Sequence, residues 1–100
     1  MDTEEEYLNL LRKINKDPEI SQRNLSDELD MSLGKINYCL KALKSKGLIK
    51  IKNFKKSEDK IKYLYYLTPR GIAEKTSATI NFMKLKMEEY EELKKEIPND

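Results

Sequence analysis

The sequence predicts one mainly α-helical domain with a β-hairpin and a long C-terminal helix. Three observations support this prediction. Apolar residues recur at helical spacing over residues 4–46, alternate with polar residues over 48–67, and follow a seven-residue pattern over 76–97. One hundred residues are enough for a single modest core but not for two domains with a cleft between them. We therefore expect a compact binding or assembly module.

The first helix is expected over residues 4–15. Thr3 and Glu6 have the spacing of a capping box, and the acidic residues 4–6 suit the positive end of a helix dipole. An apolar stripe with helical spacing follows, made of Tyr7, Leu8, Leu10, Leu11 and Ile14. Pro18 then interrupts the pattern.

A short second helix is predicted after this break. Ser21 is a suitable N-cap, and Leu25 and Leu29 have the spacing of inward-facing residues. Asp30 and Met31 are expected to form a tight turn into the next helix.

The stretch "SLGKINYCLKALKSKG" predicts the third helix. Ser32 is its expected N-cap, the helix runs to Lys46, and Gly47 is a natural stop. At about 100° per residue, its side chains divide into two faces. The apolar arc holds Leu33, Ile36, Cys39, Leu40 and Leu43, and the opposite face holds Gly34, Asn37, Tyr38, Lys41 and Ser45. The arc is the expected core face, and the opposite face is free to contact a partner.

A β-hairpin follows, because the period changes to two. In "LIKIKNF", Ile49 and Ile51 share one face, and in "KIKYLYYL" the residues Ile61, Tyr63, Tyr65 and Leu67 share one. The polar stretch "KKSEDK" is the loop between the strands. Two strands alone are not stable in water, so the hairpin is expected to lie against the helices.

The last helix begins at "TPRG", with Thr68 as cap and Pro69 in the first position. Residues spaced alternately by four and three then form a heptad seam, which Pro98 is expected to end. The seam consists of Thr76, Ile80, Met83, Met87, Tyr90, Lys94 and Ile97. It could pack on its own domain or on a second copy. Because the pattern outlasts the rest of the fold, we expect a homodimer with Ile80, Met83, Met87, Tyr90 and Ile97 at the interface, weakened by Lys94.

The composition argues against catalysis, a metal site and a cofactor. The chain contains no histidine and one cysteine, so it has neither an imidazole base nor a Cys/His ligand cluster. No apolar run approaches the roughly 18 residues of a membrane span. The acidic start "MDTEEEYL" lacks the features of a signal peptide, so we expect a cytoplasmic protein that does not associate with membranes.

Positive charge is confined to the middle of the chain. Residues 1–20 carry a net charge of −3, residues 21–70 of +7, and residues 71–100 of −2. This asymmetry fits a polyanionic partner, and it also fits an ordinary lysine-rich surface. Charge alone leaves the two explanations equal.

A short helix, a tight turn, a second helix and a two-stranded wing together describe a winged helix-turn-helix. We expect residues 1–68 to form this DNA-binding unit and residues 69–100 to form a dimerisation helix within the same compact body. In such a fold, the N-terminal half of the second helix lies in the major groove of double-stranded DNA.

Side chains in three places are then candidates for DNA contact. Asn37 can read adenine with two hydrogen bonds, and Gly34 allows a close approach of the backbone, although glycine is also tolerated in a first turn. Wing lysines are expected to contact phosphates. The candidate residues are Gln22, Arg23, Ser32, Gly34, Lys35, Asn37, Tyr38, Lys41, Lys55, Lys56 and Lys60.

The stretches "SQRNLSDELDMSLGKINYCLKALKSKGLIKIKNF" and "YYLTPRGIAEK" resemble the MarR-family regulators, whose wing closes on a similar "LT…G" corner. The resemblance covers about residues 5–97 and is nearest to the EPS-associated subgroup, through "SLGKINYCLKAL". It implies a transcriptional regulator, linked by this subgroup to exopolysaccharide genes. Larger members have further dimerisation helices that enclose an effector pocket, so we expect no small-molecule effector here. Lys60 follows Asp59 where family wings often carry arginine, which weighs against minor-groove insertion.

Two further interpretations remain open. Cys39 lies at the edge of the apolar arc, where a buried thiol is the commoner explanation and a redox sensor the rarer one. The same fold can also serve as a protein-interaction module, with the heptad-patterned C-terminus as its binding surface.

Overall fold

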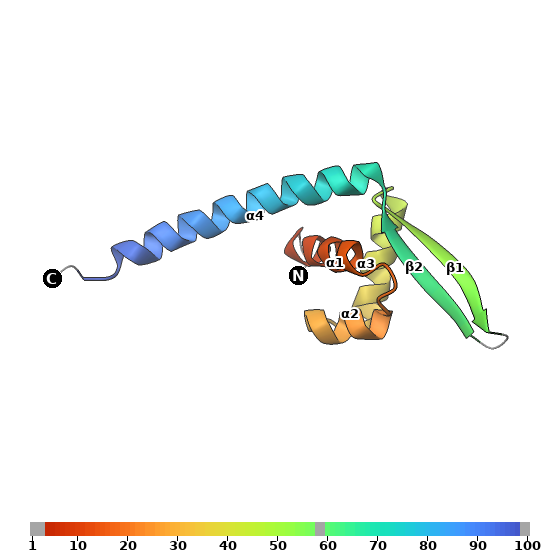
Figure 1. Cartoon of the computed structure of the whole chain (residues 1–100). Coiled ribbons are helices and arrows are strands. Elements are labelled where there is room, and N and C mark those ends of the chain that lie inside the picture. The colour runs from red at the N-terminus through yellow and green to blue at the C-terminus, as the bar shows by residue number, and fades with distance from the viewer. Residues whose placement is uncertain (1–3, 58–59, 99–100) are drawn as a thin grey trace.

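The computed structural model describes residues 4–57 and 60–98, except the side chains of residues 54–61. Its elements appear in the predicted order, helix, helix, helix, hairpin and long helix (Figure 1). They are α1 (Glu4–Lys16), α2 (Gln22–Leu29), α3 (Leu33–Ser45), β1 (Ile49–Ser57), β2 (Lys60–Leu67) and α4 (Pro69–Lys95). The mainly helical fold class with one antiparallel hairpin is therefore confirmed.

The core lies between α1, α2 and α3 and is closed by the base of the hairpin. Its members are Leu10, Leu11, Ile14, Ile20, Leu25, Met31, Ile36, Cys39, Leu40, Leu43, Leu48, Ile49 and Tyr65. Cys39 is 3% exposed, so the thiol is part of this packing, and Leu29 packs against the cluster as predicted. The apolar stripes predicted for the first three helices thus form one shared core with the base of the hairpin.

One residue of the predicted core arc is not buried. Leu33 is 48% exposed, although its angular position on α3 falls within the arc. It is the first residue of α3 and follows the cap Ser32. At a helix end fewer neighbouring elements cover a side chain, so the helical angle alone does not predict burial there.

The wing is an antiparallel ladder in which Ile49 lies opposite Leu67 and Ile51 opposite Tyr65. Tyr65 is buried, and its backbone N–H donates to the Pro18 carbonyl at 2.9 Å, which joins the wing to the loop after α1. Tyr63, two residues along the same face, is 47% exposed. The strands therefore project beyond the helices that cover their base, and the far part of the hairpin stands clear of the core (Figure 1).

The wing meets α4 at a tight crossing of the chain. Thr68 caps α4 by accepting a hydrogen bond from the Gly71 N–H at 2.9 Å, and its own N–H donates to the Leu48 carbonyl at 3.0 Å. A Cβ on Gly71 would lie 1.9 Å from the Leu48 carbonyl oxygen. Glycine is therefore required for α4 to cross the start of β1.

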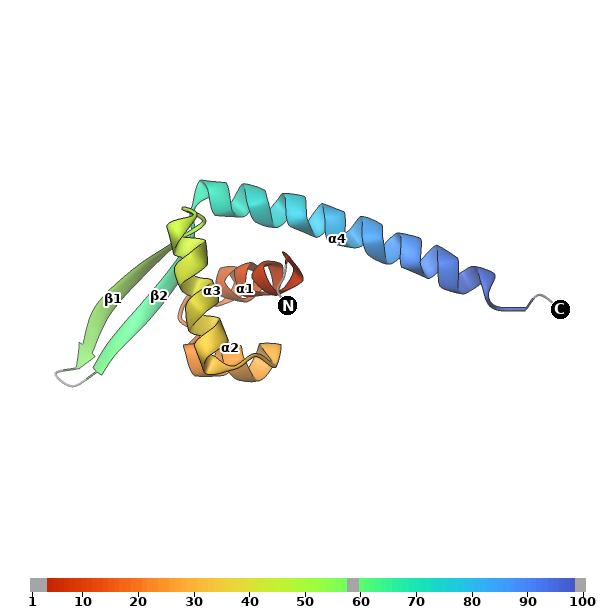
Figure 2. The ribbon, with the colours of Figure 1, turned by 180° about the vertical axis from the view of Figure 1, so that it is seen from behind.

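Helix α4 is much longer than the body it crosses. It runs along α1 and continues past the N-terminal end of α1, so the chain measures 68 × 27 × 22 Å (Figures 1 and 2). The helix ends at Lys95, before Pro98, and Ile97 therefore lies outside the helical part of the heptad seam. None of the helices in the described residues has the length and apolar character needed to cross a bilayer.

Candidate nucleic-acid interface

A short, well-held turn presents the start of α3. Ser21 caps α2, and Asp30 ends it in the left-handed region with φ of 54°. The Met31 N–H donates to the Ser26 carbonyl at 3.1 Å, and the Ser26 hydroxyl donates to the Met31 carbonyl. Ser32 then caps α3 by accepting from the Lys35 N–H at 3.1 Å. The predicted helix, turn and helix are thus joined by fixed backbone geometry.

The predicted outer face of α3 is open to solvent in its first turns. Tyr38 is 68% exposed, Lys41 is exposed, and a Cβ added to Gly34 would meet nothing within 4 Å. In Figure 2, α3 lies on the near side of the helical cluster with the wing beside it. The exposed Leu33 extends this surface with an apolar contact that the sequence pattern assigns to the core.

Asn37, the predicted base-reading amide, is half-buried and part of a hydrogen-bond chain. Its Nδ2 donates to Gln22 Oε1 at 3.5 Å, and Gln22 Nε2 donates to the hydroxyl of the buried Tyr65 at 3.3 Å. An amide has two N–H donors and one carbonyl acceptor, so Asn37 keeps one N–H and its Oδ1 for another contact. The chain joins α2, α3 and β2, and it orients two of the candidate DNA-binding residues.

Lys35, a second candidate, holds an ion pair inside the molecule. Its Nζ lies 2.8 Å from Glu6 Oε2 on α1, with both side chains about one third exposed. Lys62 on the wing is paired similarly with Glu19, also at 2.8 Å. The carboxylate in such a pair offsets the charge of the lysine and competes with a phosphate for its ammonium group.

The structure describes the side chains of some of the remaining candidates and not of others. Arg23 and Ser32 are exposed at the starts of α2 and α3. Lys55, Lys56 and Lys60 lie outside the described side chains. Every charged residue between Met31 and Ser57 is a lysine, so Lys44, Lys50 and Lys52 add positive charge to α3 and the wing. The run of lysines is visible in the sequence, but the net charge of residues 21–70 hides it because that segment also contains acidic residues.

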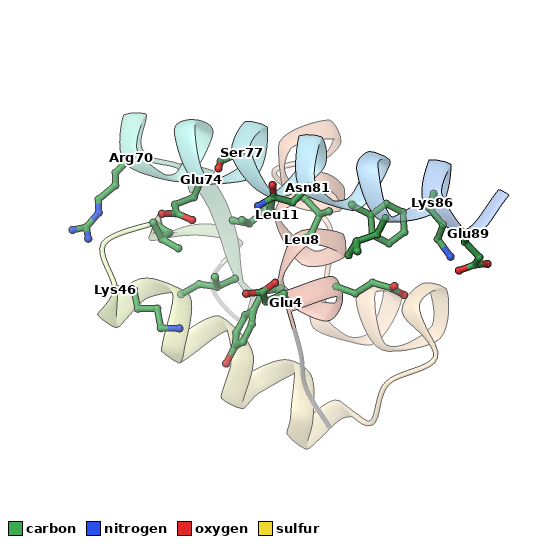
Figure 3. A pocket seen from close by; sticks show the side chains of 17 residues that line it. Glu4, Leu8, Leu11, Lys46, Arg70, Glu74, Ser77, Asn81, Lys86 and Glu89 are labelled. Carbon is green, nitrogen blue, oxygen red and sulfur yellow. The ribbon is translucent and has the colours of Figure 1, made fainter. Parts of the chain in front are cut away.

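A groove of about 590 Å³ lies elsewhere, between α1 and α4 (Figure 3). Its floor includes Leu8, Leu11 and Leu43, and its rim carries both basic and acidic side chains, among them Lys46 and Glu74. Residues Ser77, Asn81 and Lys86 line it from α4. Within residues 4–57 and 60–98, no group of three or more His, Cys, Asp or Glu side chains is placed to hold a metal ion.

Comparison with known proteins identifies the fold. Residues 8–50, from α1 to the start of β1, match the model of a winged helix-turn-helix DNA-binding family. A comparison with curated protein sequences gives no match.

Solved structures of bacterial proteins share the architecture. A mutant of ZitR from Lactococcus lactis is similar with a TM-score of 0.71 and 18% identity, over 93% of this chain and 61% of that one. MarR of Staphylococcus aureus, in complex with salicylate and kanamycin, is similar with a TM-score of 0.66 and 23% identity, over 88% of this chain and 57% of that one. FabT of Streptococcus pneumoniae, in complex with DNA, has a TM-score of 0.64 and 22% identity, over 86% of this chain and 58% of that one. The chain spans about three fifths of the length of these structures, and at such identities the similarity establishes the winged helix-turn-helix fold.

Proposed function

We propose that this chain is a MarR-type transcriptional regulator that binds specific sequences of double-stranded DNA as a homodimer in the cytoplasm. The observation that carries the proposal is the outer face of α3, where Tyr38 and Lys41 are exposed around an open Gly34. A helix capped at a fixed turn, polar on its outer face and followed by a lysine-rich wing, has the form that enters a major groove.

In this proposal the contacts divide by role. Asn37, Tyr38 and Lys41 contact base edges from the outer face of α3. Arg23, Ser32 and the wing lysines 55, 56 and 60 contact phosphates and set the position of the protein on the duplex. Gln22 orients Asn37, and Lys35 joins the phosphate contacts when it leaves Glu6.

Two copies of the chain are needed for a two-fold operator with paired half-sites. The C-terminal dimerisation segment, residues 69–100 with α4 as its helical part, supplies the contact through Ile80, Met83, Met87, Tyr90 and Ile97, all of which are exposed in one copy. From the sequence resemblance to EPS-associated regulators, we further propose exopolysaccharide genes as targets.

Selection of bound sequences from random duplexes, followed by titration at several salt concentrations, tests this function. We expect a near-palindromic preferred site. Affinity should fall steeply with salt, because each phosphate contact contributes roughly −0.9 to the slope of log K against log salt. Binding no tighter than to scrambled duplexes at moderate salt would overturn sequence-specific regulation.

A charge-reversal pair locates the surface. Lys41→Glu combined with Lys55→Glu is expected to weaken duplex binding by at least about tenfold, or 1.4 kcal/mol, and to leave the dimer intact. Arg12→Glu combined with Lys95→Glu makes the same change of net charge at exposed positions of α1 and α4. An equal loss with both pairs would mean that only overall charge matters.

The exposed apolar side of α4 favours a second candidate, a protein-interaction module. If α4 serves a protein partner instead, the charge-reversed α3 variant keeps its partner and the wild-type chain has no preferred duplex. The same two measurements therefore separate the candidates.

A further inference from the structure

Helix α4 has two different sides. The groove above α1 is lined from α4 by Ala78, Phe82 and Leu85 among others, and no residue of the heptad seam lines it. At about 100° per residue, the seam centres roughly 180° away from the groove-lining side chains. Figure 3 shows Ser77, Asn81 and Lys86 on the side of α4 that overlooks α1 and α3. The seam therefore faces away from the body of its own chain.

The middle of the seam, from Ile80 to Tyr90, is apolar and uncovered. Ile80, Met83, Met87 and Tyr90 are 49%, 57%, 66% and 62% exposed. A heptad row of this kind is covered when another helix inserts its own knobs between these side chains. A second copy of this chain carries the same row, and a two-fold axis matches the row to itself. Thus a second copy is the partner whose chemistry fits.

The charges of α4 favour one direction for that second helix. Residues 69–86 carry a net charge of +3, and residues 87–98 carry −3. An antiparallel pair places each positive half beside the negative half of the other copy, whereas a parallel pair places like halves together. A parallel pair also sets Lys94 against the partner's Lys94 within the seam, where like charges repel.

Lys84 decides the register of an antiparallel pair. When Met87 lies opposite the partner's Tyr90, Met83 lies opposite the partner's Lys94, and the flanking Lys84 lies beside the partner's Glu91. A shift by one heptad toward the N-terminus instead brings Lys84 next to the partner's Lys84. The first register pairs opposite charges twice, once on each side of the two-fold axis.

We infer that two α4 helices pack antiparallel through the heptad seam, with Met87 of one copy against Tyr90 of the other and Lys84 beside Glu91. This inference rests on the proposed homodimer and adds its direction and register. In this register, residues 82–95 of the two α4 helices overlap.

Disulfide trapping in the full chain tests the direction. Met83→Cys and Lys94→Cys are made separately in a Cys39→Ala background, mixed, and oxidised gently. The antiparallel register predicts the mixed disulfide, because positions 83 and 94 of different copies are opposite. Each variant alone should stay unlinked, because two copies of one position are about 16 Å apart along the axis, too far for a disulfide.

Two trapping results overturn the inference. Self-linked dimers of each variant would mean parallel helices. A chain that sediments as a monomer and forms no disulfide would exclude the seam as an interface. Duplex binding is measured on the same samples, so a monomer that still selects a DNA sequence contradicts the pairing of α4 and leaves the proposed DNA reading in place.

A charge swap gives an answer that does not depend on the cysteine variants. Lys84→Glu should weaken dimerisation by severalfold in sedimentation, and adding Glu91→Lys should restore it. Lys86→Glu is the matched control, since a parallel pair would place Lys86, not Lys84, beside the partner's Glu91. Rescue of Lys86→Glu alone by Glu91→Lys overturns the antiparallel register.

Discussion

The packed head, residues 4–72, buries most of its apolar residues, whereas the rest of α4 exposes most of its own. In the head, Ile36 and Leu10 are fully buried by neighbours from the same chain. On α4, Met87 and Tyr90 are more than 60% exposed. Both regions show apolar residues at helical spacing, so periodicity predicts a helix in each. It does not tell whether the chain itself or another molecule covers the apolar face.

The largest expected difference between the two regions is the cost of removing one apolar side chain. Ile36→Ala should lower the free energy of unfolding by about 2–5 kcal/mol, because it leaves a cavity in a closed core. Met87→Ala should change the unfolding of the head by less than about 0.5 kcal/mol, because an exposed side chain loses little packing. Urea unfolding at low protein concentration checks both values. Equal costs would mean that the seam packs on its own chain.

Two glycines differ in the space around them: Gly71 lies where the head meets α4, and Gly34 lies in the first turn of α3. Gly71→Ala should destabilise the fold by about 1–3 kcal/mol or more, because the added Cβ meets the Leu48 carbonyl. Gly34→Ala serves as the control, since its Cβ meets open space, and it should leave the fold unchanged or slightly more stable. Thermal unfolding of the two variants distinguishes these effects. Loss of duplex affinity in the stable Gly34→Ala variant would indicate close backbone approach to DNA.

Within the head, removing the Tyr65 hydroxyl separates the contribution of the buried ring to stability from the contribution of the hydrogen-bond chain to DNA recognition. Tyr65→Phe keeps the buried ring and removes the partner of Gln22, so we expect a stability loss of about 0.5–1.5 kcal/mol. We also expect weaker discrimination at the base read by Asn37. Affinities for the selected duplex and for a single-base variant measure this. Unchanged discrimination would mean that the hydrogen-bond chain only supports the fold.

The smallest expected effect concerns the ion pair between α1 and α3. Glu6→Gln should cost less than about 1 kcal/mol of stability, since the pair is partly exposed. Without the Glu6 carboxylate competing for Lys35, duplex affinity should rise by a few fold and the salt dependence should steepen by about one unit. Glu28→Gln, which releases Lys13 on α1, is the matched control and should leave affinity unchanged. Equal behaviour of the two variants would exclude a role for Lys35.

Local signals in the sequence predicted the elements well. Serine and threonine before an apolar period predicted all three observed caps, at Ser21, Ser32 and Thr68. Gly47 ends α3 with φ of 76°, as expected for a glycine stop. These positions were predictable because a cap or a left-handed turn depends on side chains within four residues along the chain.

The candidate interface was predictable only in part. The wheel of α3 separated Tyr38 and Lys41 from the core, and both are exposed. It did not predict the exposure of Leu33, the bond between Asn37 and Gln22, or the pair of Lys35 with Glu6. Each of these depends on residues from another element, whose approach is not encoded in the period of one helix.

The sequence by itself determined where helices, strands and caps form, because backbone propensity and local hydrogen bonds act over short stretches of chain. It also determined where the positive charge lies. Only the tertiary structure decided which amphipathic faces are covered. It placed Gly71 against Leu48, tied Asn37 to the core through Gln22, and turned the heptad seam of α4 away from its own head. Burial is a property of neighbours in space, and those neighbours are set by how the elements pack together.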